Sequence, residues 1–169
     1  KMFVKVKFFY EFNGFYGYVF AQQEGIDLCL RLQRVGYKIY VEPASVVYHV
    51  GGGTLPIGDR KKVFLNFRNN LVMMTKNLPF TEAIWKIPYR IFLDAVAAYT
   101  FLFMGSLSTY LSIASAHFHF AGWLLFGKRG KKLTSLKMQN IVPVYDGSIV
   151  WQYFIKKKRF FSEIIFNKK

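Results

Sequence analysis

The central part of the chain shows apolar positions repeating in helical steps. Across residues 22–35, Leu28 and Leu32 lie four positions apart, as neighbouring side chains on one helix face do. Gly36 follows directly and is well placed to end a helix in the left-handed conformation. The pattern therefore predicts a helix over residues 22–35.

Shorter segments around this helix alternate with a period of two. Residues 37–42 read "YKIYVE" and residues 45–50 read "SVVYHV", both rich in β-branched and aromatic side chains. Residues 4–8 alternate valine or phenylalanine with lysine, and a turn at Asn13 and Gly14 follows. One helix and two or three strands predict an α/β fold with part of a mixed sheet.

The second half of the chain favours helices. Residues 60–76 show a helical pattern, and Pro79 and Pro88 are expected to punctuate a connection after it. Residues 91–127 contain a single formal charge, and residues 95–116 form a 22-residue uncharged run that is long enough to cross a bilayer core. Three interpretations stay open for this run: a weak transmembrane helix, two helices lying at the membrane interface, or two buried helices of a soluble bundle.

The net charge of the chain limits the classes of partner that it is expected to bind. The formal net charge is +15, and basic chains favour nucleic acids, anionic lipids or phosphorylated small molecules. Residues 128–169 carry eleven basic and two acidic residues, a net charge of +9, interleaved with aromatic side chains beside the apolar run. This arrangement favours an anionic membrane, and the absence of a nucleic-acid-binding motif disfavours nucleic acid. We therefore expect three regions, 1–58, 59–127 and 128–169.

Two acidic residues open the predicted central helix. Glu24 and Asp27 lie three positions apart in its first turn. Acidic side chains there interact favourably with the helix dipole, by about 0.3–1 kcal/mol each, which explains them without catalysis. The alternative is that one carboxylate is a general base, held where loops converge at the end of a sheet.

Other candidate ligands lie nearby in the sequence. His49 ends the second predicted strand and precedes Gly51 and Gly52, whose backbone N–H groups could contact an anion while the imidazole binds a divalent metal. Arg68 lies in the next predicted helix, where it is either a solvated side chain or a contact to a phosphate or sugar. Spacing alone makes each of these signals weak.

The stretch "NGFYGYVFAQQEGIDLCLRLQRVGYKIYVEPASVVYHVGGGTL" resembles the C-terminal part of the catalytic domain of bacterial family 2 glycosyltransferases, which have the GT-A fold. Such members usually read "GGFDEDFFAHxEEIDLCWRLxxxGYKIxYVPxSxVYHxGGGTL". The similarity continues through "FLNFRNNLVMMTKNLP" and reaches "GSIVWQYFIKKKRFFSE". It implies a partial Rossmann-like sheet followed by a mostly helical, membrane-associated extension at the cytoplasmic face of the bacterial inner membrane.

The resemblance also implies an activity. Enzymes of this family move a sugar from a nucleotide-sugar donor to the hydroxyl of a glycan or lipid-linked acceptor, with inversion and with Mg²⁺ or Mn²⁺ as cofactor. The positions that match the family's motifs are Glu24 and Asp27 for the acid motif, His49 for the metal–diphosphate, Asn13 and Gly14 for the loop bordering the acceptor, and Gly51, Gly52 and Arg68 for further donor or acceptor contacts.

The chain departs from the family pattern in two ways. At the position where the family has the acid that is usually assigned as general base, this chain has Gly25, which has no group to accept a proton. No Asp-x-Asp occurs in the chain, and residues 1–12 are too short for the nucleotide-binding half. We therefore expect a fragment that is incomplete or inactive alone, and of low solubility because a partial sheet exposes its edges. The alternative is a non-catalytic membrane-binding or scaffold module.

Overall fold

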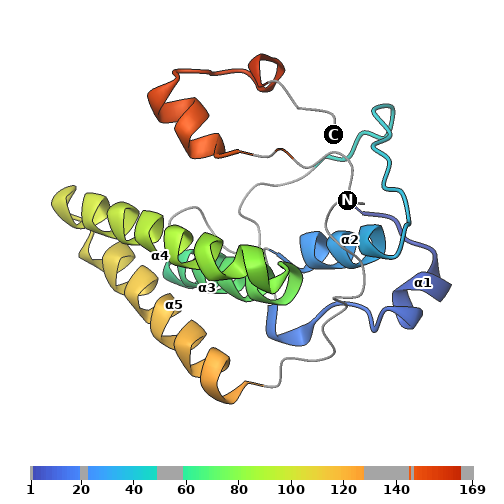
Figure 1. The fold of residues 1–169 in the computed structure, drawn as a ribbon, viewed down its shortest axis with the longest axis horizontal. Coiled ribbons are helices and arrows are strands. Elements are labelled where there is room, and N and C mark those ends of the chain that lie inside the picture. The colour runs from blue at the N-terminus through green and yellow to red at the C-terminus, as the bar shows by residue number, and fades with distance from the viewer. Residues whose placement is uncertain (1, 20–22, 49–58, 128–144, 146, 165–169) are drawn as a thin grey trace.

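The computed structural model describes residues 2–19, 23–48, 59–127, 145 and 147–164. Helical segments form all of the regular structure in these residues (Figure 1). They are α1 (Val6–Glu11), the 3₁₀ turn η1 (Gly17–Val19), α2 (Glu24–Arg34), α3 (Arg60–Asn77), α4 (Phe80–Phe103), α5 (Leu107–Phe126), the π-helical turn η3 (Trp151–Ile155) and the 3₁₀ turn η4 (Phe161–Glu163).

The predicted α/β fold is wrong, because the described residues contain no strand. Residues 37–42 and 45–48 have no regular secondary structure, and residues 4–8 overlap α1. Alternation stabilises a strand only where a neighbouring strand completes the hydrogen-bond ladder and covers the apolar face. Here the alternating side chains stay in solvent, with Val41 88% exposed. The expectation of low solubility from sheet edges loses its structural basis.

The central helix is confirmed as α2. Its buried face includes Leu28 and Leu32, as the four-residue spacing predicted. Gly36 follows with a φ of +92°, and its N–H donates to the Gln33 carbonyl. The N–H of Tyr37 returns to the Leu32 carbonyl, so the last turn is closed by the glycine-containing cap.

The helix expected over residues 60–76 is confirmed as α3. The connection expected at Pro88 is wrong, because this residue lies in α4. The Asp59 side chain caps α3 by accepting from the Lys62 N–H at 3.0 Å. Helix α4 continues through Pro88, which lies well inside it. A proline removes one backbone donor, but its φ is compatible with a helix. The packing of residues before and after Pro88 therefore maintains the helix across the missing hydrogen bond. Gly105, with a φ of +82°, lies in the turn to α5.

Helices α3, α4 and α5 pack on one another, and α2 packs on α3 (Figure 1). A cluster of Val19, Leu71, Val72, Phe120 and Trp123 forms the buried centre where η1, α3 and α5 meet. The apolar segment 91–127 belongs to two helices, the C-terminal half of α4 and the whole of α5. Within the described residues, no helix combines the length and the apolar character needed to cross a membrane.

Candidate functional site

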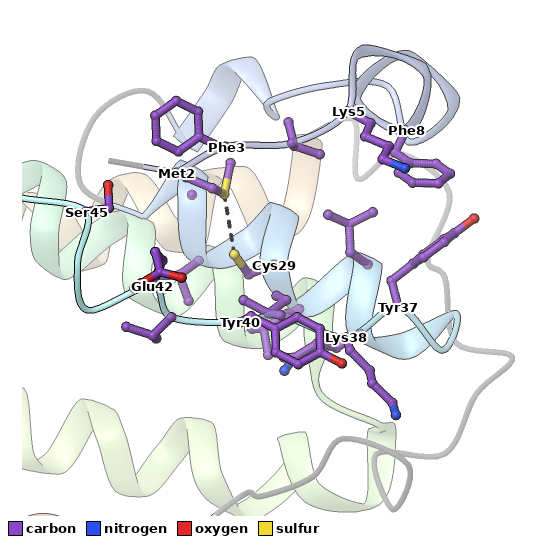
Figure 2. Close-up of a pocket in the computed structure, with 18 of the residues that line it drawn as sticks. Met2, Phe3, Lys5, Phe8, Cys29, Tyr37, Lys38, Tyr40, Glu42 and Ser45 are labelled. Atoms are coloured by element: carbon purple, nitrogen blue, oxygen red, sulfur yellow. Dashed lines mark hydrogen bonds between the residues drawn. The ribbon is translucent and has the colours of Figure 1, made fainter.

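An open groove runs beside α2 (Figure 2). Its volume is about 1170 Å³, and its walls come from the N-terminal segment, α2 and the extended residues after it. Most of the lining is apolar, including Phe3, Phe8, Ile26, Tyr37 and Ile39, and Glu24 and Gly25 lie in its wall. The start of α2 therefore faces a groove that is large enough for a small molecule.

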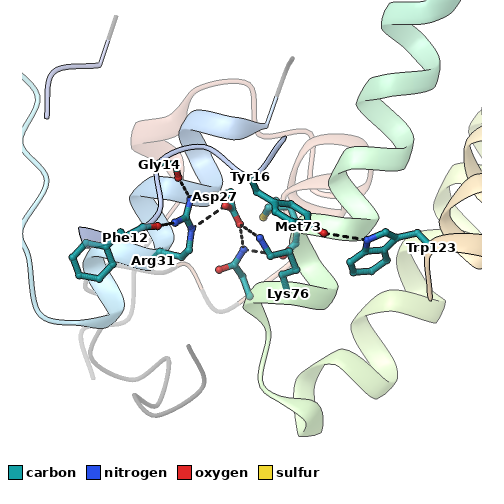
Figure 3. Close-up of polar contacts among 9 residues, drawn as sticks. Phe12, Gly14, Tyr16, Asp27, Arg31, Met73, Lys76 and Trp123 are labelled. Carbon is teal, nitrogen blue, oxygen red and sulfur yellow. Dashed lines mark hydrogen bonds and ion pairs between the residues drawn. The ribbon is translucent and has the colours of Figure 1, made fainter. Parts of the chain in front are cut away.

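Asp27 does not share this exposed position, because its side chain is fully buried. Its Oδ2 accepts from Nε of Arg31 at 2.9 Å, and its Oδ1 accepts from Nδ2 of Asn77 at 2.8 Å. The Lys76 ammonium lies 3.6 Å from the same Oδ1 (Figure 3). Both carboxylate oxygens thus accept hydrogen bonds, one from α2 and one from α3, and this buried network links the two helices.

Arg31 connects this carboxylate to the turn at Asn13 and Gly14. Its Nη1 donates to the Phe12 carbonyl, and its Nη2 donates to the Gly14 carbonyl at 2.7 Å (Figure 3). Asn13 and Gly14 both have a φ of 56°, a conformation that glycine and asparagine tolerate best. The structure therefore brings together Asn13, Gly14 and Asp27, three of the residues singled out from the sequence.

Sequence reasoning missed the residues that hold this cluster. Arg31 follows Asp27 by four positions, a spacing that signals a helical ion pair. Lys76 and Asn77 are 49 and 50 positions away from Asp27, so no local pattern could place them. Burial lowers the pKa of Lys76, and the charge of Asp27 opposes this effect. The Lys76 Nζ also lies 3.5 Å from the centre of the Tyr16 ring.

Glu24 contrasts with Asp27. Its Oε2 is shielded from solvent and accepts no hydrogen bond from the described residues. The side chain is partly exposed and lines the groove. At Gly25, an added Cβ would meet no atom within 4 Å, so the helix has room for a side chain there. Glu24 is accordingly the acid of this motif that lines the groove.

Arg68 has a different environment from the one expected. Its Nη2 donates to the Tyr18 carbonyl at 2.8 Å, and its Nε donates to Oδ1 of Asn69 at 2.9 Å. The guanidinium lies 4.5 Å from the centre of the Tyr18 ring, and burial lowers its pKa. Arg68 thus ties α3 to η1, away from the groove residues. A contact to a phosphate or sugar stays a prediction.

The described part of the chain contains no site for the metal that the resemblance predicts. No group of three or more histidine, cysteine, aspartate or glutamate side chains gathers there. His49, Gly51 and Gly52 lie outside the described residues. The described residues therefore do not fit a metal centre, and we assign no chemical step to one.

No known protein family, curated protein or solved structure matched the chain. The resemblance to family 2 glycosyltransferases consequently rests on the residues quoted above.

Proposed function

We propose that this chain is the acceptor-side part of a nucleotide-sugar-dependent glycosyltransferase. In this proposal α2 presents Glu24 to the groove, and the network around Asp27 holds α2 against α3 and the Asn13–Gly14 turn. The apolar lining of the groove favours an acceptor with an apolar part, such as a lipid-linked glycan.

The proposed chemistry uses Glu24 as general base. An acceptor hydroxyl oxygen forms the new bond to the anomeric carbon while the bond to the donor diphosphate breaks. The hydroxyl proton passes to the Glu24 carboxylate, and the nucleoside diphosphate leaves with the bonding electrons. Base catalysis at such a step is typically worth about 10²–10⁴ in rate.

One observation carries this assignment. Of the two acids in the motif, Asp27 has both oxygens engaged by Arg31 and Asn77, whereas Glu24 lines the groove and its Oε2 has no partner among the described residues. A general base must also be within reach of the acceptor, and the buried Asp27 side chain is not, whereas Glu24 lines the groove. Glu24 therefore takes the role that Gly25 cannot fill.

The test uses a longer protein, in which the nucleotide-binding half of a bacterial family 2 glycosyltransferase, with its Asp-x-Asp, is fused ahead of this chain. The longer protein is incubated with a panel of nucleotide sugars and a membrane extract as acceptor, and release of nucleoside diphosphate is measured. We expect turnover with one donor, and a loss of about 10²–10⁴ for Glu24→Gln.

Glu11→Gln is the matched control, because Glu11 is an exposed acid at the end of α1. It should leave turnover unchanged. A second variant, Gly25→Glu, should raise turnover if position 25 is the better place for a base. Turnover by Glu24→Gln at the unaltered rate would remove Glu24 as base, and no turnover with any donor would favour the non-catalytic alternative.

A further inference from the structure

Helix α4 presents a continuous apolar stripe to solvent. Its exposed aromatic and aliphatic side chains recur in steps of three and four along nearly the whole helix. They are Trp85, Tyr89, Phe92, Val96, Tyr99 and Phe103, and Met104 and Leu107 extend the exposed surface around the tip of the α4–α5 hairpin. With 24 residues, α4 is about 36 Å long. We call the six α4 residues the outer stripe.

The charged residues that follow one another along the same helix pair with one another. Glu82, Lys86, Arg90 and Asp94 follow one another at intervals of four and form two ion pairs, Glu82–Lys86 and Arg90–Asp94. Asp94 is buried, and its Oδ2 lies 3.2 Å from Nε2 of His117 on α5. The Arg90 guanidinium lies 5.8 Å from the centre of the Phe67 ring on α3.

Helix α4 thus differs from a usual surface helix of a water-soluble protein, which turns one apolar stripe to the core and a polar face to solvent. Here the four charges pair with one another along the helix, Ile87 and Ile91 pack against the core, and a second apolar stripe faces solvent. Such an arrangement suits a helix whose outer environment is apolar.

We infer that the outer stripe of α4 inserts into the surface of an anionic membrane, with the helix lying parallel to the bilayer plane. This inference is independent of the proposed sugar transfer, since it rests on α4 and not on the groove. Trp85, Tyr89 and Tyr99 are the residue types that favour the headgroup region. A net charge of +15 draws the chain to anionic lipids, and Lys156–Arg159 adjoin the exposed aromatic residues of η3.

A second copy of the chain is the main competitor for this surface, because the three-four spacing also suits helix pairing. Two features disfavour it. Helix pairs of this kind are built on leucine, isoleucine and valine at the seam, whereas five of the six residues here are aromatic. Two chains of charge +15 would also repel, whereas an anionic bilayer attracts each of them.

The first experiment measures binding to vesicles by flotation. Phosphatidylcholine vesicles with and without phosphatidylglycerol are mixed with the wild-type chain and with the double variant Phe92→Gln/Val96→Gln. We expect binding that needs phosphatidylglycerol, and an affinity lower by about tenfold in the double variant because two inserted side chains become polar.

Val6→Gln/Tyr10→Gln is the matched control. Val6 and Tyr10 are also a valine and an aromatic residue four apart, and they are 69% and 74% exposed on α1. This variant should bind as the wild type does. Equal loss in both variants, no loss in either, or no binding to either vesicle would overturn the inference.

A second experiment reads insertion without relying on the folding of the polar variant. Phe92→Cys, in a Cys29→Ser background, is labelled with the environment-sensitive dye NBD, and Tyr10→Cys labelled in the same way is the reference. Anionic vesicles should shift the emission at position 92 to shorter wavelength and leave position 10 unchanged. A label at 92 that is already shielded before vesicles are added would show that another copy or segment covers the stripe, and would overturn the inference.

Discussion

At the residue scale, the two acids of the central motif have separate roles. Asp27 lies at the centre of a buried polar cluster, while Glu24 lines the groove with an unpartnered oxygen. The helix dipole does not explain this difference, because both residues lie in the first turn of α2 and interact with the same dipole. The difference comes from α3, which supplies Lys76 and Asn77 to Asp27 alone.

Removing the charge of Asp27 should therefore be costly. Asp27→Asn leaves Arg31 and Lys76 without their buried counter-charge, and losing one partner of a buried ion pair typically costs about 3–5 kcal/mol. Urea denaturation followed by circular dichroism should show a loss of about 3 kcal/mol or more. Glu82→Gln is the comparison, because its partly exposed pair with Lys86 should be worth at most about 1 kcal/mol. Equal losses in the two variants would contradict a structural role for Asp27.

Gly25 offers the opposite test. It is the second residue of α2 and has free space around its Cα, and glycine costs up to about 1 kcal/mol relative to alanine in a helix. Gly25→Ala should therefore raise the free energy of unfolding by up to about 1 kcal/mol. Gly36→Ala in the same assay should lower it, since Gly36 has a φ of +92°. A destabilised Gly25→Ala variant would mean that position 25 has no free space.

At the element scale, packing decided where helices continue. Helix α4 runs through Pro88 although proline disfavours the interior of a helix. Partly buried residues on both sides of it, Ile87 and Ile91, pack against the core cluster. Their burial holds two halves of one helix together across the missing backbone donor.

Replacing this proline should stabilise the chain. Pro88 is exposed, so Pro88→Ala removes little buried contact and restores the hydrogen bond to the carbonyl four residues before it. A proline in a helix interior costs about 3 kcal/mol relative to alanine, and part of this should be recovered as a higher denaturation midpoint. Pro79→Ala, at the N-cap of α4, is the control and should change stability less. An unchanged or lower midpoint for Pro88→Ala would show that α4 needs its proline.

At the scale of the whole molecule, one sign of charge dominates. The chain has twenty-four basic and nine acidic residues. Some of the acidic residues form ion pairs within α2 and α4. The remaining positive charges repel one another in the folded chain more than in the expanded unfolded chain. Salt screens this repulsion over about 10 Å at 0.1 M.

Stability should therefore rise with ionic strength. Between about 0.01 M and about 0.15 M sodium chloride, the melting temperature should increase, with each gain of about 1 kcal/mol appearing as about 2–4 °C for a chain of this size. Sucrose at matched osmolality separates charge screening from exclusion effects. A melting temperature that falls with salt would show that the ion pairs of Asp27 and Asp94 outweigh the repulsion.

Local patterns in the sequence predicted two of the helices, α2 and α3, and the end of α2. Leu28 and Leu32 with Gly36 placed α2, and the helical pattern over residues 60–76 placed α3, because helical periodicity and capping depend on neighbours within a few positions. Tertiary structure alone decided the rest. Residues 37–42 carry a strand pattern yet have no partner strand among the described residues, Pro88 is held in a helix by packing, and Asp27 became structural through residues 49 and 50 positions away. Each of these outcomes depends on contacts between distant segments, which local spacing does not encode.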